Sequence, residues 1–123
     1  MELILLPDSL AICRLSQNVP IPPWALAGEF FALCRSEEEL SIVCPDGLPP
    51  AGVEADSGWK ALKVQGPLPL SETGVIAALS APLAEAGIAV FVISTFDTDY
   101  LLVKESDLSK AVRVLRHRHS VHT

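Results

Sequence analysis

Residues 87–104, GIAVFVISTFDTDYLLVK, carry the pattern that decides the fold. Ile88–Ser94 is a continuous run of apolar, largely β-branched residues, which predicts a strand covered on both faces. The polar sequence FDTD that follows is typical of a turn, and Tyr100–Lys104 predicts the returning strand. This stretch therefore predicts a β-hairpin.

A helix is predicted on each side of this hairpin. Before it, Gly74–Ala86 places apolar residues on one helical face, and Ser71 or Thr73 is the expected N-cap. Pro82 lies inside this segment and is expected to bend or break the helix, because it cannot donate a backbone hydrogen bond. After the hairpin, Glu105–Asp107 is expected to cap a last helix.

Around this core the chain predicts further strands. Trp59–Val64 supplies a strand before the first helix, which gives the order strand–helix–strand–strand–helix. A complete βαββαβ sandwich needs one more strand, which an N-terminal strand could supply. Pro45–Gly58, rich in Pro and Gly, is the expected linker to the first half. In that half the predicted strands are Glu2–Leu6, Leu10–Leu15, Glu29–Arg35 and Leu40–Cys44, with a single helical turn in Pro22–Ala27.

The composition indicates a small globular protein. The chain has 123 residues, of which 50% are apolar and 20% charged, so it can bury a core. Its 15 acidic and 9 basic residues give a net charge of −6, which argues against a nucleic-acid partner. No apolar stretch is long enough for a bilayer and the acidic start is unlike a signal peptide, so we expect a cytoplasmic protein with no membrane partner. The three cysteines lack paired spacing and are expected to be free, buried thiols.

The hairpin and its surroundings resemble the CASTOR-type branch of the ACT domains. The similarity lies in AGIAVFVISTFDTDYLLVKESDL (residues 86–108) and in GPLPLSETGVIAALSAPLA (residues 66–84), and STFDTDY followed by apolar residues and Lys-Glu is its most specific part. EFFALCRSEEELSIVCP (residues 29–45) looks like the truncated ACT-like module that precedes the ACT domain in these proteins. The resemblance spans Leu3–Leu115, and RHRHSVHT (residues 116–123) has no counterpart in it.

The resemblance implies a fold, a division of the chain and a role. The fold is α+β, a ferredoxin-like βαββαβ ACT sandwich, with two tandem ACT-like modules packed as one unit. The implied boundaries are residues 1–57 for the truncated module, 58–117 for the ACT domain and 118–123 for a polar tail. The implied role is that of a non-enzymatic regulatory or sensor protein without a cofactor, which binds a small ligand, usually an amino acid, and forms a homodimer or larger homo-oligomer. The alternative is a ligand-free module that pairs with another ACT-containing protein.

The loop that leads into the long helix is the first candidate part of a ligand site. A helix start offers unpaired N–H groups and partial positive charge, which suit a carboxylate, although an ordinary helix cap is the alternative. A glycine in this loop lets a ligand approach the backbone, and helix propensity predicts that replacing it by Ala leaves folding intact. The candidate residues are Ser71, Glu72, Thr73, Gly74, Val75 and Ile76.

The FDTD turn is the second candidate part. Asp97 and Asp99 can receive an ammonium or guanidinium group, although Asp is also common in turns because it hydrogen-bonds its own backbone. In the arginine-sensing members of the resembled branch, an acidic residue matching Asp99 pairs with the guanidinium, and backbone at the positions of Thr95 and Phe96 contributes. Asp99 is expected to be the better placed carboxylate, because it adjoins the strand that starts at Tyr100.

No catalytic constellation and no metal site are expected. His117, His119 and His122 lie in the polar C-terminal segment, which we expect to be mobile, and a general base needs a fixed geometry. The sequence also lacks a glycine-rich phosphate loop followed by lysine.

Overall fold

The computed structural model describes all residues, 1–123, and the chain divides into two compact units. The larger unit consists of Met1–Pro7 and Lys60–Thr123, and the smaller unit is Asp8–Trp59. Strands β1 (Glu2–Leu15) and β4 (Glu54–Val64) each begin in one unit and continue into the other. The first seven residues therefore belong with the later part of the chain.

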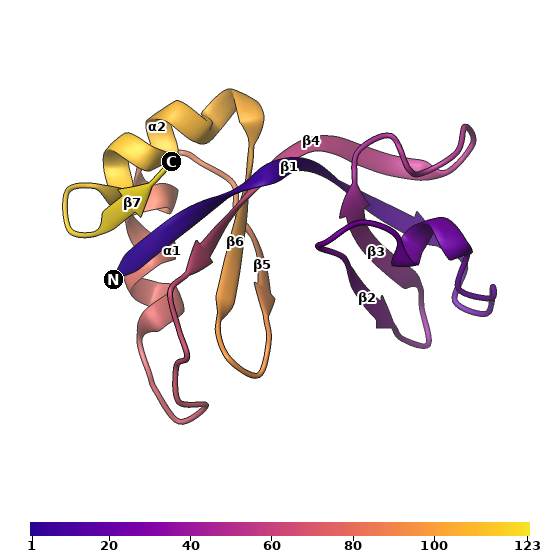
Figure 1. Cartoon of the computed structure of the whole chain (residues 1–123), viewed down its shortest axis with the longest axis horizontal. Coiled ribbons are helices and arrows are strands. Elements are labelled where there is room, and N and C mark those ends of the chain that lie inside the picture. Colours follow the sequence, from indigo (N-terminus) through magenta and orange to yellow (C-terminus); the bar gives the residue numbers. More distant parts are fainter. The chain divides into compact units, whose positions relative to one another are not determined.

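The larger unit is a sheet covered by two helices. Its strands follow the order β1-β4-β6-β5, with β5 formed by Phe91–Ser94 and β6 by Asp99–Lys104. Helices α1 (Val75–Glu85) and α2 (Glu105–Leu115) lie side by side on one face of this sheet (Figure 1). Strand β1 lies beside β4 and so supplies the further strand that the predicted strand–helix–strand–strand–helix unit lacked in its sheet. The architecture is α+β.

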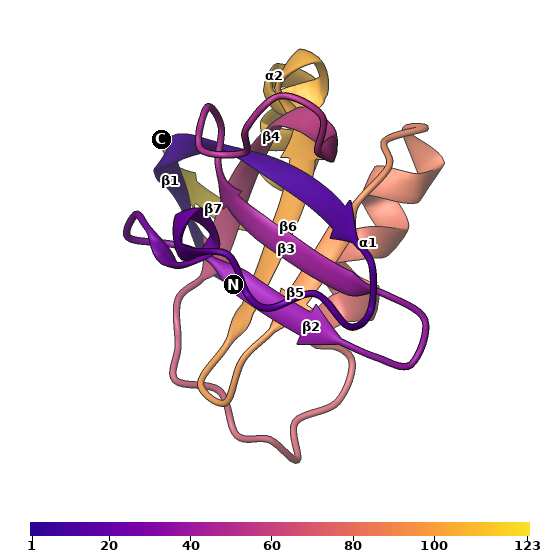
Figure 2. The ribbon, with the colours of Figure 1, turned by 90° about the vertical axis from the view of Figure 1, so that its right-hand side faces the viewer.

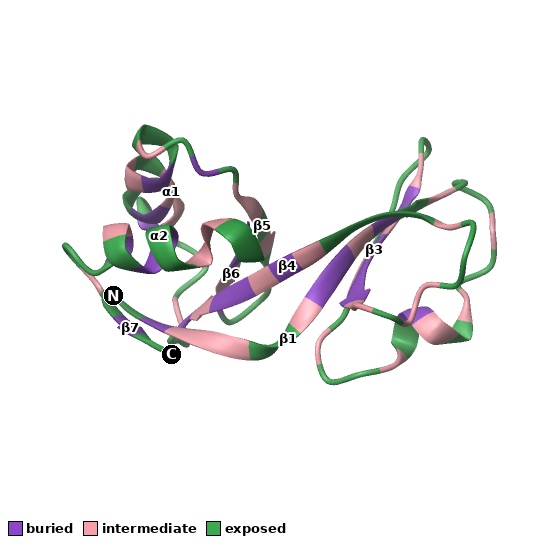
Figure 3. Cartoon of the chain, turned by 90° about the horizontal axis from the view of Figure 1, so that it is seen from above, coloured by how far each residue is buried: buried purple, intermediate pink, exposed green.

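The core of the larger unit lies between the helices and the sheet. Each helix buries one face against the sheet, with Val75, Leu79 and Leu83 buried on α1, and the buried positions appear purple in Figure 3. The buried residues of each helix are spaced so that they share one helical face, which is the face that packs on the sheet. The residues that are fully shielded from solvent here are Leu3, Leu62, Val64, Leu79, Leu83, Leu101, Val103, Ala111 and Leu115.

The smaller unit has a core of its own. Strands β2 (Ala32–Arg35) and β3 (Leu40–Pro45) form an antiparallel pair, and β3 pairs antiparallel with the second half of β1 (Figure 2). A short 3₁₀ helix, η1 (Pro23–Leu26), precedes them. The buried cluster comprises Ala11, Cys13, Ala25, Leu40, Ile42 and Cys44. The expectation that the two modules pack as one unit stays a prediction.

The three thiols are free but differ in their surroundings. Cys13 and Cys44 are buried, whereas Cys34 is exposed, so the expectation of three buried thiols is wrong for Cys34. Burial raises the pKa of Cys44 to about 12, and the neighbouring Cys13 thiol adds to the effect. Burial likewise raises the pKa of Cys13.

Two strand predictions near the ends of the sheet are corrected. The two N-terminal strands predicted on either side of Pro7 are one strand, β1, in which the Pro7 carbonyl accepts a hydrogen bond of 2.7 Å from Lys60 Nζ. Strand β5 starts only at Phe91 and is the last strand of its sheet, with alternate residues exposed rather than covered on both faces. Ile88 precedes β5 and is buried against the helices, which accounts for the apolar character of the run.

The C-terminal segment, expected as a mobile tail, is ordered. Ser120–His122 forms β7, which pairs in parallel with Glu2–Ile4 of β1. His122 Nε2 lies 3.0 Å from Glu2 Oε1, and the Ser120 N–H donates to the Met1 carbonyl at 3.0 Å. The segment is ordered because the edge of β1 that does not pair with β4 is open to it, and the sequence of the polar segment does not reveal this partner.

Helix α1 continues through Pro82 without a break. Proline has no N–H, so the carbonyl four residues earlier, that of Ala78, loses its helical donor. Burial lowers the pKa of His119, and the Ala78 backbone opposes this shift, which places the His119 ring near this part of the helix. The ring nitrogen Nδ1 lies 3.1 Å from the N-terminal nitrogen of Met1. None of the helices is long and apolar enough to cross a membrane.

Candidate functional site

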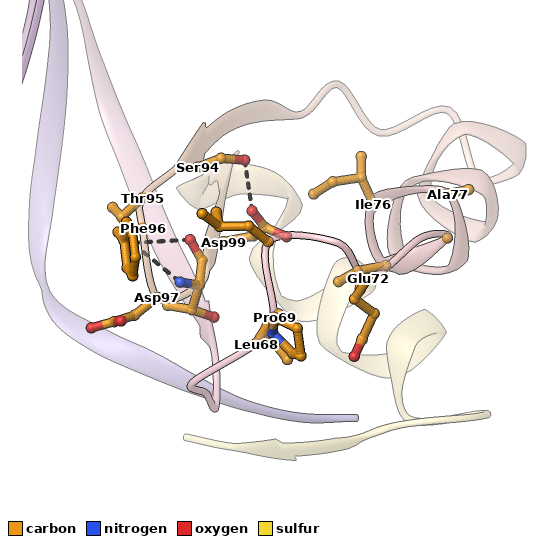
Figure 4. A pocket seen from close by; sticks show the side chains of 14 residues that line it. Leu68, Pro69, Glu72, Ile76, Ala77, Ser94, Thr95, Phe96, Asp97 and Asp99 are labelled. Carbon is orange, nitrogen blue, oxygen red and sulfur yellow. Dashed lines mark hydrogen bonds between the residues drawn. The ribbon is translucent and has the colours of Figure 1, made fainter.

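A cavity of about 340 Å³ lies in the larger unit, between the start of α1 and the turn that joins β5 to β6 (Figure 4). Its size falls within the range of about 300–1,000 Å³ that is usual for small-ligand pockets. One wall is formed by the loop and first turn of α1, and the other by the end of β5 and the following turn. The two segments predicted from the sequence to form a ligand site are therefore brought together.

The helix wall offers backbone donors. Helix α1 begins at Val75, has no side-chain cap and carries no acidic residue in its first turn. The first intrahelical bond near this end runs from the Ala78 N–H to the Gly74 carbonyl at 3.0 Å, so the preceding N–H groups have no helical acceptor. These donors, together with the positive end of the helix dipole, suit a carboxylate.

Gly74, and not Ser71 or Thr73, is the N-cap of α1. Its φ of +83° lies in the left-handed region, which side-chain-bearing residues rarely adopt. A Cβ built on Gly74 would meet nothing within 4 Å, so the space in front of the helix start is open. Helix propensity does not apply at Gly74, because this residue lies outside the helix and an Ala in its place would be strained at this φ.

The opposite wall carries a carboxylate that is held in place. The Ser94 hydroxyl donates to Asp99 Oδ1 at 2.6 Å, across the pair that these two residues form in the β5–β6 ladder. In Figure 4 the Asp99 carboxylate lies on the side of the turn that faces Ile76 of α1, whereas the Asp97 side chain points away from the helix. A tight turn makes the two carboxylates diverge, and Asp99 is the one directed at the helix start.

The turn between β5 and β6 is closed by its own hydrogen bonds. The Thr95 N–H donates to the Thr98 carbonyl at 2.8 Å, and the Thr98 N–H donates to Thr95 Oγ1 at 3.2 Å. These bonds leave Phe96 at the tip, 78% exposed. The carboxylate of Asp99 therefore stands on a turn of fixed shape at the start of β6.

Most of the predicted site residues line this cavity, and some lining residues were not predicted. Ser71 and Thr73 lie in the loop before α1 but do not line the cavity. Ser94 could have been found from the sequence, since a four-residue turn places it opposite Asp99. The predicted residues that line the cavity are Glu72, Gly74, Val75, Ile76, Thr95, Phe96, Asp97 and Asp99. The lining residues that sequence reasoning missed are Leu68, Pro69, Leu70, Ala77, Ser94 and Thr98.

The chemistry of the lining suits binding of a molecule with charges of both signs. The lining residues include three carboxylates but no Lys, Arg, His or Cys. The helix start can receive a negative group, and the carboxylate of Asp99 can receive a positive one.

Comparison with known proteins assigns a family to both parts of the chain. The family model of the ACT domain matches residues 54–117, and a model described as an N-terminal domain matches residues 8–50. The human cytosolic arginine sensor for mTORC1 subunit 1 is 38% identical over 61 residues, which cover 49% of this chain and 18% of that protein. The chain thus matches only a small part of this relative's length.

Solved structures agree over nearly the whole chain. A crystal structure of a protein from Agrobacterium tumefaciens has a TM-score of 0.92 and 43% identity, and the match covers 98% of this chain and 90% of that one. The regulatory subunit of aspartate kinase from Thermus thermophilus, in its ligand-free form, has a TM-score of 0.63 at 14% identity, with 94% and 95% of the two chains covered. The second likeness shows a shared fold alone. With a family model that matches over half of its residues, the chain belongs to the ACT-domain family.

Proposed function

We propose that this chain is a non-catalytic regulatory protein that binds a free amino acid with a cationic side chain in the cavity at the start of α1. The observation that carries the proposal is the pairing of unsatisfied helix N–H groups with the Asp99 carboxylate across one cavity without a basic side chain. In this arrangement the α-carboxylate lies at α1 and the cationic group lies at Asp99. The printed name of the human relative, an arginine sensor, supports the choice of a basic amino acid.

A titration series of matched ligands tests this proposal. Isothermal calorimetry and thermal shift with L-arginine, L-lysine, L-citrulline and L-glutamate separate charge from shape, because citrulline is close to arginine in shape but neutral. We expect arginine or lysine to bind and citrulline and glutamate to bind weakly or not at all. A ligand at a hundredfold excess over its Kd stabilises the native state by about 2.7 kcal/mol. Failure of both L-arginine and L-lysine to bind would refute the proposed function.

We also propose that the chain works as a homodimer or larger homo-oligomer in the cytoplasm. Leu70 and Phe96, two apolar side chains beside the cavity, are 72% and 78% exposed, which is unusual for a surface that stays in water. Strand β5 is the last in its sheet and leaves one edge free to pair. The cytosolic location in the relative's name supports the proposed compartment. Light scattering at about 100 μM gives the subunit number, and a monomer mass would contradict the oligomer.

A further inference from the structure

Thr98 is a buried polar residue on the turn that carries Asp99. It is 5% exposed, and no other polar or charged residue of the chain is buried to this degree. Its hydroxyl donates to the carbonyl of Val64 at 2.6 Å. Val64 is the last residue of β4, where the loop toward α1 begins. The side chain of Thr98 therefore ties the β5–β6 turn to the root of that loop.

Two further contacts hold the loop against the same turn. The Leu68 N–H donates to the Asp97 carbonyl at 2.7 Å. A Cβ added at Gly66 would lie 3.0 Å from the Asp97 carbonyl oxygen and 3.2 Å from Thr98 Cβ, which is closer than side chains normally allow. The loop thus lies directly on the turn, and the missing side chain of Gly66 makes this approach possible.

We infer that Thr98 and Gly66 are positioning residues, which fix the separation between the helix start and the Asp99 carboxylate and so determine which ligand fits. The inference rests on the proposed function. The loop carries the helix side of the cavity and the turn carries the carboxylate side, and these three contacts join them a few residues from the ligand groups. Neither residue needs to touch the ligand for this role.

The strength of the effect follows from the geometry that binding requires. A ligand that contacts both walls needs them held within about 0.5 Å of the productive spacing. Without its hydroxyl, residue 98 leaves the Val64 carbonyl with one partner fewer in a buried environment, and the loop loses a fixed point at its root. Ligand affinity then falls because the loop must be ordered on binding.

The test compares Thr98→Val, which removes the hydroxyl at nearly constant shape, with Thr98→Ser, which keeps it. Ile88→Val is the control for a general loss of stability, because Ile88 is 4% exposed in the same core and does not line the cavity. The first readout needs no ligand and is amide hydrogen exchange of Leu68 measured by NMR. We expect Thr98→Val to accelerate this exchange about tenfold, and Thr98→Ser and Ile88→Val to change it little.

The second readout is the Kd for L-arginine, measured by calorimetry well below the unfolding temperature. We expect Thr98→Val to weaken binding about tenfold, and Thr98→Ser to restore affinity to within about threefold of the parent. Gly66→Ala should push the loop from the turn and change the ratio of arginine to lysine affinity, a change in selectivity that loss of stability alone does not produce.

The two readouts separate this inference from the proposed function. If the parent does not bind L-arginine but Leu68 exchange responds as expected, the choice of ligand fails while the tie between loop and turn stands. Unchanged Leu68 exchange in Thr98→Val overturns the inference whatever the ligand is. Altered exchange with unchanged arginine affinity in Thr98→Val overturns it as well, because the tie then has no effect on the site.

Discussion

Removal of the charge at Asp99 tests the central feature of the proposed site. Asp99→Asn keeps an oxygen that can accept the Ser94 hydroxyl, now 2.6 Å from Asp99 Oδ1, and replaces the second oxygen by an amide group. The hairpin contact is preserved and only the negative charge is lost. The free energy of unfolding should therefore stay within about 0.5 kcal/mol of the parent.

The loss of ligand affinity can be estimated from the contact that disappears. A hydrogen bond to a charged group contributes about 1.5–3 kcal/mol, which corresponds to roughly a tenfold to hundredfold change in Kd. Asp99 is half-buried and partly open to water, so we expect a value near the lower end. For a neutral ligand of similar shape, such as citrulline, the substitution should make little difference.

The assay is calorimetric titration of L-arginine into the parent, Asp99→Asn and two controls. Asp97→Asn makes the same chemical change two residues away, where the side chain points away from α1, and should weaken binding by less than about threefold (Figure 4). Asp8→Asn, in the smaller unit, matches the change in net charge and should have no effect. An Asp99→Asn variant that binds arginine as well as the parent, or equal losses at both turn positions, would refute the reasoning.

Further predictions concern stability and reactivity. Gly74→Ala should lower the free energy of unfolding by about 1–2 kcal/mol, because φ at this position is +83°, and a urea titration that shows stabilisation would contradict this. In native protein at pH 8, iodoacetamide should alkylate Cys34 but neither Cys13 nor Cys44, because burial raises the pKa of both of these thiols. All three should react in urea, and mass spectrometry counts the adducts. Labelling of Cys13 or Cys44 before unfolding would contradict this prediction. Burial, and next the nearby N-terminal ammonium, lower the pKa of His119, so the unfolded chain binds more protons below about pH 6.5. The stability from this group should be complete above that pH and decline as pH falls through the lowered value, and His119→Gln should make the decline shallower in urea titrations at pH 7.5 and 5.5.

The strand order of the larger unit was accessible from the sequence, because its elements have clear local patterns. The run before the FDTD turn and the strand after it have strong β-propensity, and the expectation that an N-terminal strand completes the sheet agrees with the observed β1. Local patterns failed where tertiary contacts decide. Nothing in RHRHSVHT indicates a strand, and Ser120–His122 is ordered because β1 offers it a free side. Likewise, Pro82 was expected to bend or break its helix, and α1 continues through it without a break.

The site was predicted in outline but not in its supporting contacts. Asp99 and the start of α1 were selected because a helix start and a carboxylate have recognisable chemistry. Gly74 rather than Thr73 is the N-cap of α1, because the backbone conformation at the helix start depends on how the loop lies on the turn. The hydrogen bond from Thr98 to Val64 joins residues 34 apart, and no local pattern reports such a pair.

The division of β1 between the two units has a consequence for the order of events during synthesis. A chain emerges from the ribosome N-terminus first, so Asp8–Trp59 has all of its own segments once residue 59 is free. Met1–Pro7 cannot pair with its part of β4 until Lys60 and the residues after it have emerged, and its other partner strand, β7, is formed by Ser120–His122. We therefore expect the smaller unit to fold first, while the opening strand stays extended and unpaired until the residues of β4 after Trp59 have emerged. During that interval it is an open strand edge, and this is the stage at which a nascent chain of this protein is most exposed to pairing with the wrong partner.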